Sequence, residues 1–110
     1  MTSGSAMISR QWKGIAKPGF ADSYVSHLKD ETFPQLASLP GFIRATVLRR
    51  NVTGGTEFQI VTLWDSLSSI EAFAGVNIEA AVVPAAVQAM MVDYDRSVVH
   101  YEIAYTFNAE

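Results

Sequence analysis

Residues 42–65 constrain the fold of this chain most, because they form a pattern of two strands joined by a tight turn. Both "FIRATVLRRN" (42–51) and "TEFQIVTLWD" (56–65) are rich in the β-branched and aromatic residues that strands favour. Between them "VTGG" supplies turn residues, which predicts a β-hairpin with a short loop. The second strand ends on Trp64, the largest aromatic side chain, and Asp65 and Ser66 follow at once.

The segment before the hairpin predicts a strand followed by an amphipathic helix. "MISRQWKGIA" (7–16) reads as the strand, with Ile8 and Trp12 on one face, and "KPG" (17–19) is a turn. From Phe20 the period lengthens to that of a helix, whose apolar stripe contains Tyr24 and Leu28 with His27 beside them. Pro34 is expected to break or kink this helix, and "TFPQ" (32–35) has the spacing of a capping box at which it restarts.

The segment after the hairpin predicts two short helices and a last strand. Ser68 and Glu71 have capping-box spacing, and Gly75 is suited to end that helix in a left-handed conformation. Pro84 suits the first turn of the next helix, and "DRSVVHYEIAYTF" (95–107) reads as a strand. The order β-α-β-β-α-β predicts a ferredoxin-like α+β fold with an antiparallel sheet. We expect one domain over residues 7–107 and a flexible tail over residues 1–6.

The strands lack a clearly solvated face, which bears on assembly. The third strand carries Phe58, Ile60, Thr62 and Trp64 on one face and Glu57, Gln59, Val61 and Leu63 on the other. The last strand carries Val99, Tyr101, Ile103 and Tyr105 opposite Val98, His100, Glu102 and Ala104. A sheet with one wet face alternates apolar and polar residues, and neither strand does so convincingly. We therefore expect a homodimer that pairs the sheet face not covered by helices with its twin.

Composition excludes several classes of function. Eight Lys and Arg against eleven Asp and Glu give a net charge of −3, with no basic run, so a nucleic-acid partner is not expected. The chain has no cysteine, which removes disulfides and thiolate chemistry and fits a cytoplasmic protein. No apolar run approaches the roughly 20 residues that span a bilayer, so we expect no membrane partner.

Several side chains are candidates for chemistry, each with a plainer alternative. Trp64 either packs the core or roofs a pocket between sheet and helices, and the two roles are compatible. His27 is either a general base or a hydrogen-bonded residue at the edge of the core. Arg44 is the arginine expected to reach inward, while Arg10 is expected to be solvated or paired.

The second histidine, His100, lies beside Glu102 on the last strand. We favour a hydrogen bond at the dimer interface over a catalytic role for this pair. Two histidines on distant elements lack the spacing of a metal site, so no metal is expected.

Five stretches together resemble the antibiotic biosynthesis monooxygenase family of dimeric α+β barrel proteins. They are "LPGF" (39–42), "EFQIVTLWDS" (57–66), "IEAFAG" (70–75), "AVVP" (81–84) and "DRSVVHYEI" (95–103). The resemblance implies the dimeric barrel fold. The wider family that the chain resembles includes cofactor-free quinol and anthrone monooxygenases and haem-degrading monooxygenases. Trp64 matches the strand-end Trp of the monooxygenases. Ile60 stands where the anthrone oxygenases have Asn, and "AAVVP" (80–84) stands where the haem-degrading branch has a histidine.

The resemblance implies a small monooxygenase without a cofactor that acts on an aromatic, quinol-type substrate. In that hypothesis Trp64, Tyr24 and Phe73 form the pocket walls, Arg44 contributes to substrate binding and His27 is the base. The alternative hypothesis is a non-catalytic dimer that binds a small aromatic ligand in the same pocket.

Overall fold

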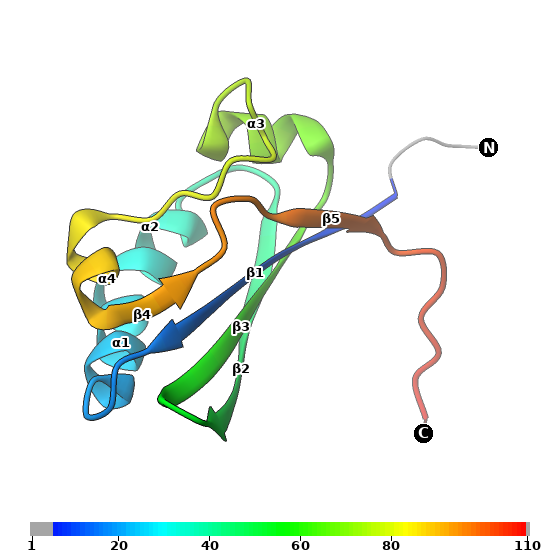
Figure 1. The fold of residues 1–110 in the computed structure, drawn as a ribbon. Helices are drawn as coiled ribbons and strands as arrows, with labels where there is room; N and C mark the ends of the chain where they lie inside the picture. The colour runs from blue at the N-terminus through cyan, green and yellow to red at the C-terminus, as the bar shows by residue number, and fades with distance from the viewer. Residues whose placement is uncertain (1–5, 110) are drawn as a thin grey trace.

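A computed structural model describes residues 6–109, and its centre is one antiparallel sheet. The strands are β1 (Ile8–Ala16), β2 (Phe42–Val52), β3 (Gly55–Trp64), β4 (Met91–Tyr94) and β5 (Val99–Glu102). Their order is β2-β3-β1-β4, and β5 also pairs with β1 (Figure 1). Because β4 and β5 share the place of a single last strand, the predicted ferredoxin-like order is confirmed.

The helices lie on one side of this sheet, where α1, α2 and α4 gather in Figure 1. They are α1 (Ala21–His27), η1 (Leu28–Thr32), α2 (Phe33–Ala37), α3 (Leu67–Ala74) and α4 (Ala85–Met90). No helix within residues 6–109 is long and apolar enough to cross a membrane. The predicted tail, 1–6, falls outside the described residues except for Ala6, and the domain bounds of 7–107 stay a prediction.

The predicted break at Pro34 is replaced by one π-helical turn. In η1 the N–H of Phe33 donates to the carbonyl of Leu28, five residues back, and the helix runs on into α2. Pro34 follows as the second residue of α2, and because proline has no N–H, the continuous helix has no backbone hydrogen-bond donor at this position. The predicted capping box at Thr32 is wrong, since Thr32 has helical dihedrals and its side chain makes no capping bond.

The cap of helix α3 lies two residues before the predicted one. Ser66 has an extended backbone and its Oγ accepts a hydrogen bond from the N–H of Ser69 at 3.2 Å, so Ser66 caps the helix in place of Ser68. Gly75 ends α3 with φ of 86°, and its N–H donates to the carbonyl of Glu71 at 2.8 Å, as the sequence predicts.

The single last strand predicted over 95–107 is wrong. Strand β4 pairs with β1 at Gly14–Ala16 and β5 pairs with Ile8–Gln11. Between them residues 96–98 leave β1 and bond to the connector before α4. The N–H of Ala81 donates to the carbonyl of Arg96, and the N–H of Val98 to that of Glu79. The strand is interrupted because this connector competes for its backbone groups.

The core consists of two clusters on the helix side of the sheet. One contains Tyr24, Leu28, Phe58, Ile60 and Val87, and the other contains Ile8, Leu36, Trp64 and Ile70. The residues of β3 predicted to share a face, Phe58, Ile60, Thr62 and Trp64, are all buried there. The inward face predicted for the second strand of the hairpin is therefore confirmed.

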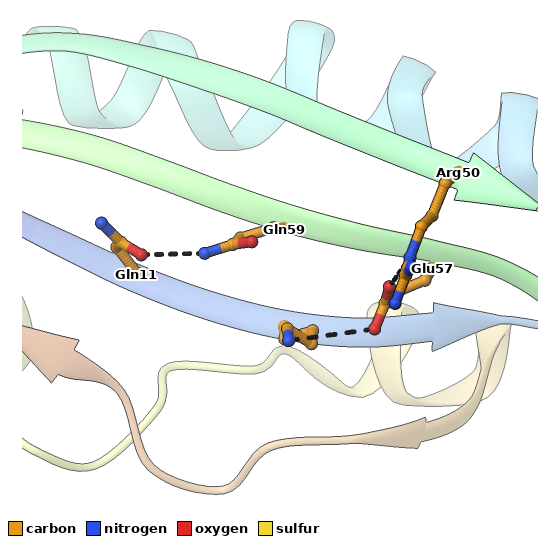
Figure 2. Close-up of polar contacts among 5 residues, drawn as sticks. Gln11, Arg50, Glu57 and Gln59 are labelled. Carbon is orange, nitrogen blue, oxygen red and sulfur yellow. Dashed lines mark hydrogen bonds and ion pairs between the residues drawn. The ribbon is translucent and has the colours of Figure 1, made fainter.

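The other face of the sheet is uncovered and mixes polar and apolar side chains. Gln59 donates to Gln11 at 2.8 Å across β3 and β1, and Glu57 pairs with both Arg50 and Lys13 (Figure 2). Around this polar row Leu48, Val99 and Tyr101 are each about half exposed. We call this surface, formed by the outward residues of β1, β2, β3 and β5, the outer face.

Candidate functional site

A cavity of about 500 Å³ lies between the sheet and the helices. The inward residues of β1 and β3 form its floor, namely Arg10, Trp12, Ile60, Thr62 and Trp64. Since every second residue of a strand points to the same face, these five positions follow directly from the pairing of Arg10 with Thr62 and of Trp12 with Ile60.

The helical side supplies mostly apolar walls to this cavity, with the polar side chains of Thr32, Gln35 and Ser38 among them. Tyr24, Leu28 and Thr32 come from α1 and η1, one turn apart, and Phe33 and Leu36 come from α2. Helix α3 contributes Phe73, and Val83 and Val87 close the side near α4. The π turn of η1 therefore forms part of the cavity wall.

Trp64 both packs the core and lines the cavity. Its side chain is fully buried, and its indole Nε1 donates to Thr62 Oγ1 at 2.9 Å. The ring stacks on Phe73 with centroids 5.8 Å apart and meets Phe42 edge-on at 5.3 Å. With its only donor satisfied inside the sheet, Trp64 presents an apolar aromatic surface to the cavity.

Tyr24 is a second aromatic wall and is 2% exposed. Its ring meets Phe58 edge-on at 4.9 Å and lies 6.4 Å from Trp12. Burial raises the pKa of the Tyr24 hydroxyl well above its usual value, because the phenolate would be desolvated. Tyr24 is therefore a neutral phenol that can donate or accept one hydrogen bond but cannot act as a base at neutral pH.

Arg10 is the charged residue among the described residues that line the cavity, and it is 6% exposed. Its Nη1 donates to the carbonyl of Ile78 at 2.5 Å and its Nη2 to that of Ala80 at 3.0 Å. The guanidinium also lies over the ring of Phe73, with Cζ 5.6 Å from the centroid. Burial lowers the pKa of Arg10 to about 10, so the side chain is still cationic at neutral pH.

His100 contacts this arginine. Arg10 Nη1 lies 3.1 Å from His100 Nε2. Because a guanidinium has no acceptor, Nε2 must accept, which places the proton of the neutral ring on Nδ1. Burial, and then the charge of Arg10, lower the pKa of His100. The structure thus gives His100 a partner on β1 within its own chain, whereas the sequence favoured a partner across a dimer interface.

Three of the five predicted site residues line the cavity and two do not. Tyr24, Trp64 and Phe73 are lining residues, whereas His27 is half-buried and Arg44 is exposed, and neither belongs to the lining. The inward position expected for Arg44 is wrong because of an irregularity in the β2–β3 pairing. Phe42 faces Trp64, but Arg44 already faces Leu63, so the strand shifts by one residue and Arg44 points to the outer face.

Arg10 and Trp12 are two of the lining residues that the sequence did not indicate as part of a site. Both follow from the alternation of β1, since Ile8, Arg10 and Trp12 share the inward face. An arginine between two large apolar residues of one strand face was the available signal. No group of three or more His, Cys, Asp or Glu within residues 6–109 could hold a metal ion.

A match to a family model establishes the family of this chain, and the match covers most of the residues that form the site. The family model of the antibiotic biosynthesis monooxygenases matches residues 7–76. That range exceeds half of the chain and includes β1, the helices that follow it, the hairpin and α3. The chain belongs to the antibiotic biosynthesis monooxygenase family. The predicted family is thereby confirmed.

Solved structures with the fold of this family member come from several bacteria. A Streptomyces coelicolor monooxygenase in complex with the ligand nanaomycin D is 16% identical with a TM-score of 0.66, covering 96% of this chain and 94% of that one. A variant of SnoaB, a cofactor-independent oxygenase from Streptomyces nogalater, is 15% identical with a TM-score of 0.66, covering 96% and 100%.

A third similar structure is a haem-degrading protein from Mycobacterium tuberculosis in its haem-free form. It is 20% identical with a TM-score of 0.61, covering 94% of this chain and 99% of that one. At these identities the likenesses establish the fold, while the ligands belong to those proteins. No curated protein matches the sequence.

Proposed function

We propose that this protein is a cofactor-independent monooxygenase that acts on an electron-rich polycyclic aromatic such as an anthrone or a quinol. The observation that carries the proposal is the cavity of about 500 Å³ walled by Trp64, Phe73 and Tyr24. Such a cavity fits a flat aromatic substrate, which the walls hold by stacking and shield from water. Family membership and the similarity to a cofactor-independent oxygenase support the same reaction class.

The chemistry asks little of the protein. Removal of a proton from C10 of an anthrone gives a carbanion that is delocalised as an enolate and transfers electrons to dioxygen. Anthrone and one dioxygen then give anthraquinone and one water, so the substrate is oxidised and no other reductant is needed. The cavity contributes by excluding water and by holding the ring system, and His27 is retained as the candidate base.

The haem-degrading reaction of one structural relative fits these residues poorly. Among the described residues the cavity lining contains no histidine, cysteine or methionine, the ligands that most often hold haem iron. Its tyrosine, Tyr24, is buried and has a raised pKa, which opposes the phenolate form that iron would need. We therefore favour the cofactor-free reaction.

The second candidate function is a non-catalytic module that binds a small aromatic ligand. Two observations favour it. Ile60, buried in the cavity floor, offers no hydrogen bond where the anthrone oxygenases carry an amide, and the ring of His27 is not part of the lining. In this function the same walls bind the ligand and no turnover follows.

We also infer that the protein is a homodimer whose two outer faces pack against each other. The exposed apolar side chains of this face, Leu48, Val99 and Tyr101, surround groups that are already paired, the Gln11–Gln59 amides and the Glu57 ion pairs. Apolar side chains around groups that are already paired can be buried against a second copy of the same face about a two-fold axis. The cytoplasmic location expected from the sequence stays a prediction.

Oxygen consumption with anthrone, 1,8-dihydroxyanthrone and menadiol tests the proposed function. We expect saturable, protein-dependent oxygen uptake with at least one of these substrates, with one dioxygen consumed for each anthrone converted to anthraquinone. Saturable binding of all three without uptake above the uncatalysed rate would favour the binding module.

A matched pair of alanine-to-tryptophan substitutions tests whether the cavity is the site of turnover. Ala72 and Ala89 are both exposed helix residues, but only Ala72 lines the cavity. The indole of Ala72→Trp would occupy the cavity, so we expect kcat/KM to fall at least about tenfold, while Ala89→Trp stays close to the parent protein. Equal activity of the two variants would place the reaction elsewhere.

The base assignment has a separate test in the same assay. His27→Ala should lower kcat by about two orders of magnitude, the usual contribution of a positioned general base. If the variant turns over as fast as the parent protein, the proton is removed by another group or by solvent, and the assignment of His27 fails while the proposed function stands.

A further inference from the structure

The cavity contains one charged side chain among its described lining residues, Arg10. A buried cation is costly unless anionic or strongly polar groups surround it. The partners of this guanidinium within residues 6–109 are the two backbone carbonyls of Ile78 and Ala80 and the neutral ring of His100. The ion pairs of the described residues are Lys13–Glu57, Arg49–Asp22 and Arg50–Glu57, so none brings a carboxylate to Arg10.

The hydrogen-bonding capacity of Arg10 is also incompletely used. A guanidinium has five N–H donors. Three of them serve Ile78, Ala80 and His100, which leaves Nε–H and one N–H of Nη2 without an acceptor in the described part of the chain. Two free N–H groups on a planar cation are suited to the two oxygens of a carboxylate.

The surroundings hold this guanidinium in place beside the aromatic walls. Two carbonyls of the connector before α4 fix one side of it, and the ring of Phe73 lies against its plane at 5.6 Å. Phe73 in turn stacks on Trp64, so the cation and the aromatic walls are adjacent. A single flat ligand can therefore contact the aromatic walls and the free donors of Arg10 together.

We propose that the cavity selects aromatic ligands that carry an anionic oxygen substituent, a carboxylate in the first instance, and that Arg10 binds this substituent. The ligand then supplies a carboxylate in direct contact with the guanidinium, which no ion pair of the described residues provides. This inference rests on the proposed function for the identity of the cavity, and it adds the charge and the orientation of the substrate.

Binding of a matched pair of ligands tests the inference. Anthracene-2-carboxylate and 2-(hydroxymethyl)anthracene have the same ring system and nearly the same size, and both report binding by their own fluorescence. Hydrogen bonds to a charged group contribute enough that we expect the carboxylate to bind at least about tenfold more tightly at pH 7.5. Equal affinities in the parent protein would overturn the proposal.

Two variants, each of which loses one positive charge, distinguish a specific anion site at Arg10 from a general electrostatic effect. Arg10→Met should lose the preference for the carboxylate and keep the affinity for the alcohol. Arg44→Met removes a cation from the exposed outer face and should keep the preference. A lost preference in Arg44→Met, or a retained one in Arg10→Met, would contradict the role of Arg10. If Arg10→Met does not fold, Arg10→Lys keeps the charge but not the fork, and its preference should fall without disappearing.

The outcome is distinguishable from that of the proposed function. A tenfold preference for the carboxylate without oxygen uptake supports the anion site in a binding module. Oxygen uptake without any preference supports the monooxygenase and refutes the anion site.

Discussion

At the residue scale, the polar side chains of the cavity floor are tied to one another across the sheet before they meet a ligand. Trp64 donates to Thr62, and Thr62 Oγ1 lies 3.3 Å from the carbonyl of Arg10, to which it donates. Arg10 in turn donates to His100. The floor of the cavity is therefore one hydrogen-bonded row across β3, β1 and β5, and Arg10 is the member of it with donors to spare.

The same row makes the stability of the protein depend on the protonation of His100. Its pKa is lower in the folded protein than in the unfolded chain, because of burial and the charge of Arg10. As the pH falls below about 6.5, the unfolded chain takes up this proton before the folded protein does. The contribution of His100 to the free energy of unfolding is therefore present above that pH and is lost as the pH falls.

Urea unfolding at pH 7.5 and 5.5 measures this contribution. His100→Asn should lose less stability between the two pH values than the parent protein does. Identical losses in His100→Asn and the parent protein would show that the contact between Arg10 and His100 does not shift the titration.

At the element scale, helix α3 is capped by a different serine from the one that the sequence pattern indicates. Ser66 accepts the N–H of Ser69, whereas Ser68, the predicted cap, lies inside the helix and is exposed. Ser66→Ala should therefore cost about 1 kcal/mol of stability, the usual value for a lost N-cap. Ser68→Ala should change the stability by a few tenths of a kcal/mol at most, since alanine is the better helix former. Chemical denaturation checks both, and a larger loss in Ser68→Ala would restore the predicted cap.

The elements that the sequence predicts correctly are those fixed by neighbours along the chain. The hairpin follows from alternation and from a turn that contains Gly54 and Gly55, and α3 ends at Gly75 for a local reason as well. The two short strands β4 and β5 do not follow from their own sequence. Their interruption depends on Glu79 and Ala81, which are distant in the sequence and bond to residues 96–98.

The candidate site residues also divide into those whose position is set by neighbouring sequence and those whose position depends on distant contacts. The inward positions of Tyr24 and Trp64 follow from the helical and strand periods of their own segments. The outward position of Arg44 depends on the shifted pairing of β2 with β3, and the importance of Arg10 depends on carbonyls of a connector nearly 70 residues away. No pattern within β1 reports those carbonyls.

At the scale of the whole molecule, the C-terminal segment does not pack on its own domain. After β5 the chain runs away from the sheet (Figure 1), and Tyr105 and Phe107 are 80% and 78% exposed. The radius of gyration is 14.7 Å, whereas a compact chain of this length has about 13 Å. Large aromatic side chains on an extended segment are costly to leave in water. A second copy of the chain that covers the outer face would be able to bury these side chains as well.

The dimer is tested by two leucines of equal exposure. Leu48 on the outer face is 50% exposed and Leu67 at the start of α3 is 48% exposed. Sedimentation should find the parent protein as a dimer at micromolar concentration. Leu48→Glu places a charge in a face that must be desolvated and should shift the protein toward monomer by at least about tenfold in dissociation constant. Leu67→Glu makes the same change of side chain away from the sheet and should leave the dimer intact.

The ligand-binding assay and the sedimentation experiment together show whether the cavity needs the dimer. The helices and the inward face of the sheet surround the cavity within one chain, so the residues that line it do not require a partner. A monomeric Leu48→Glu that still prefers anthracene-2-carboxylate would show that the ligand site is complete in one protomer. A parent protein that sediments as a monomer at micromolar concentration would contradict the dimer. The exposed face would then need a different partner, while Arg10 and the aromatic walls would keep their assignment.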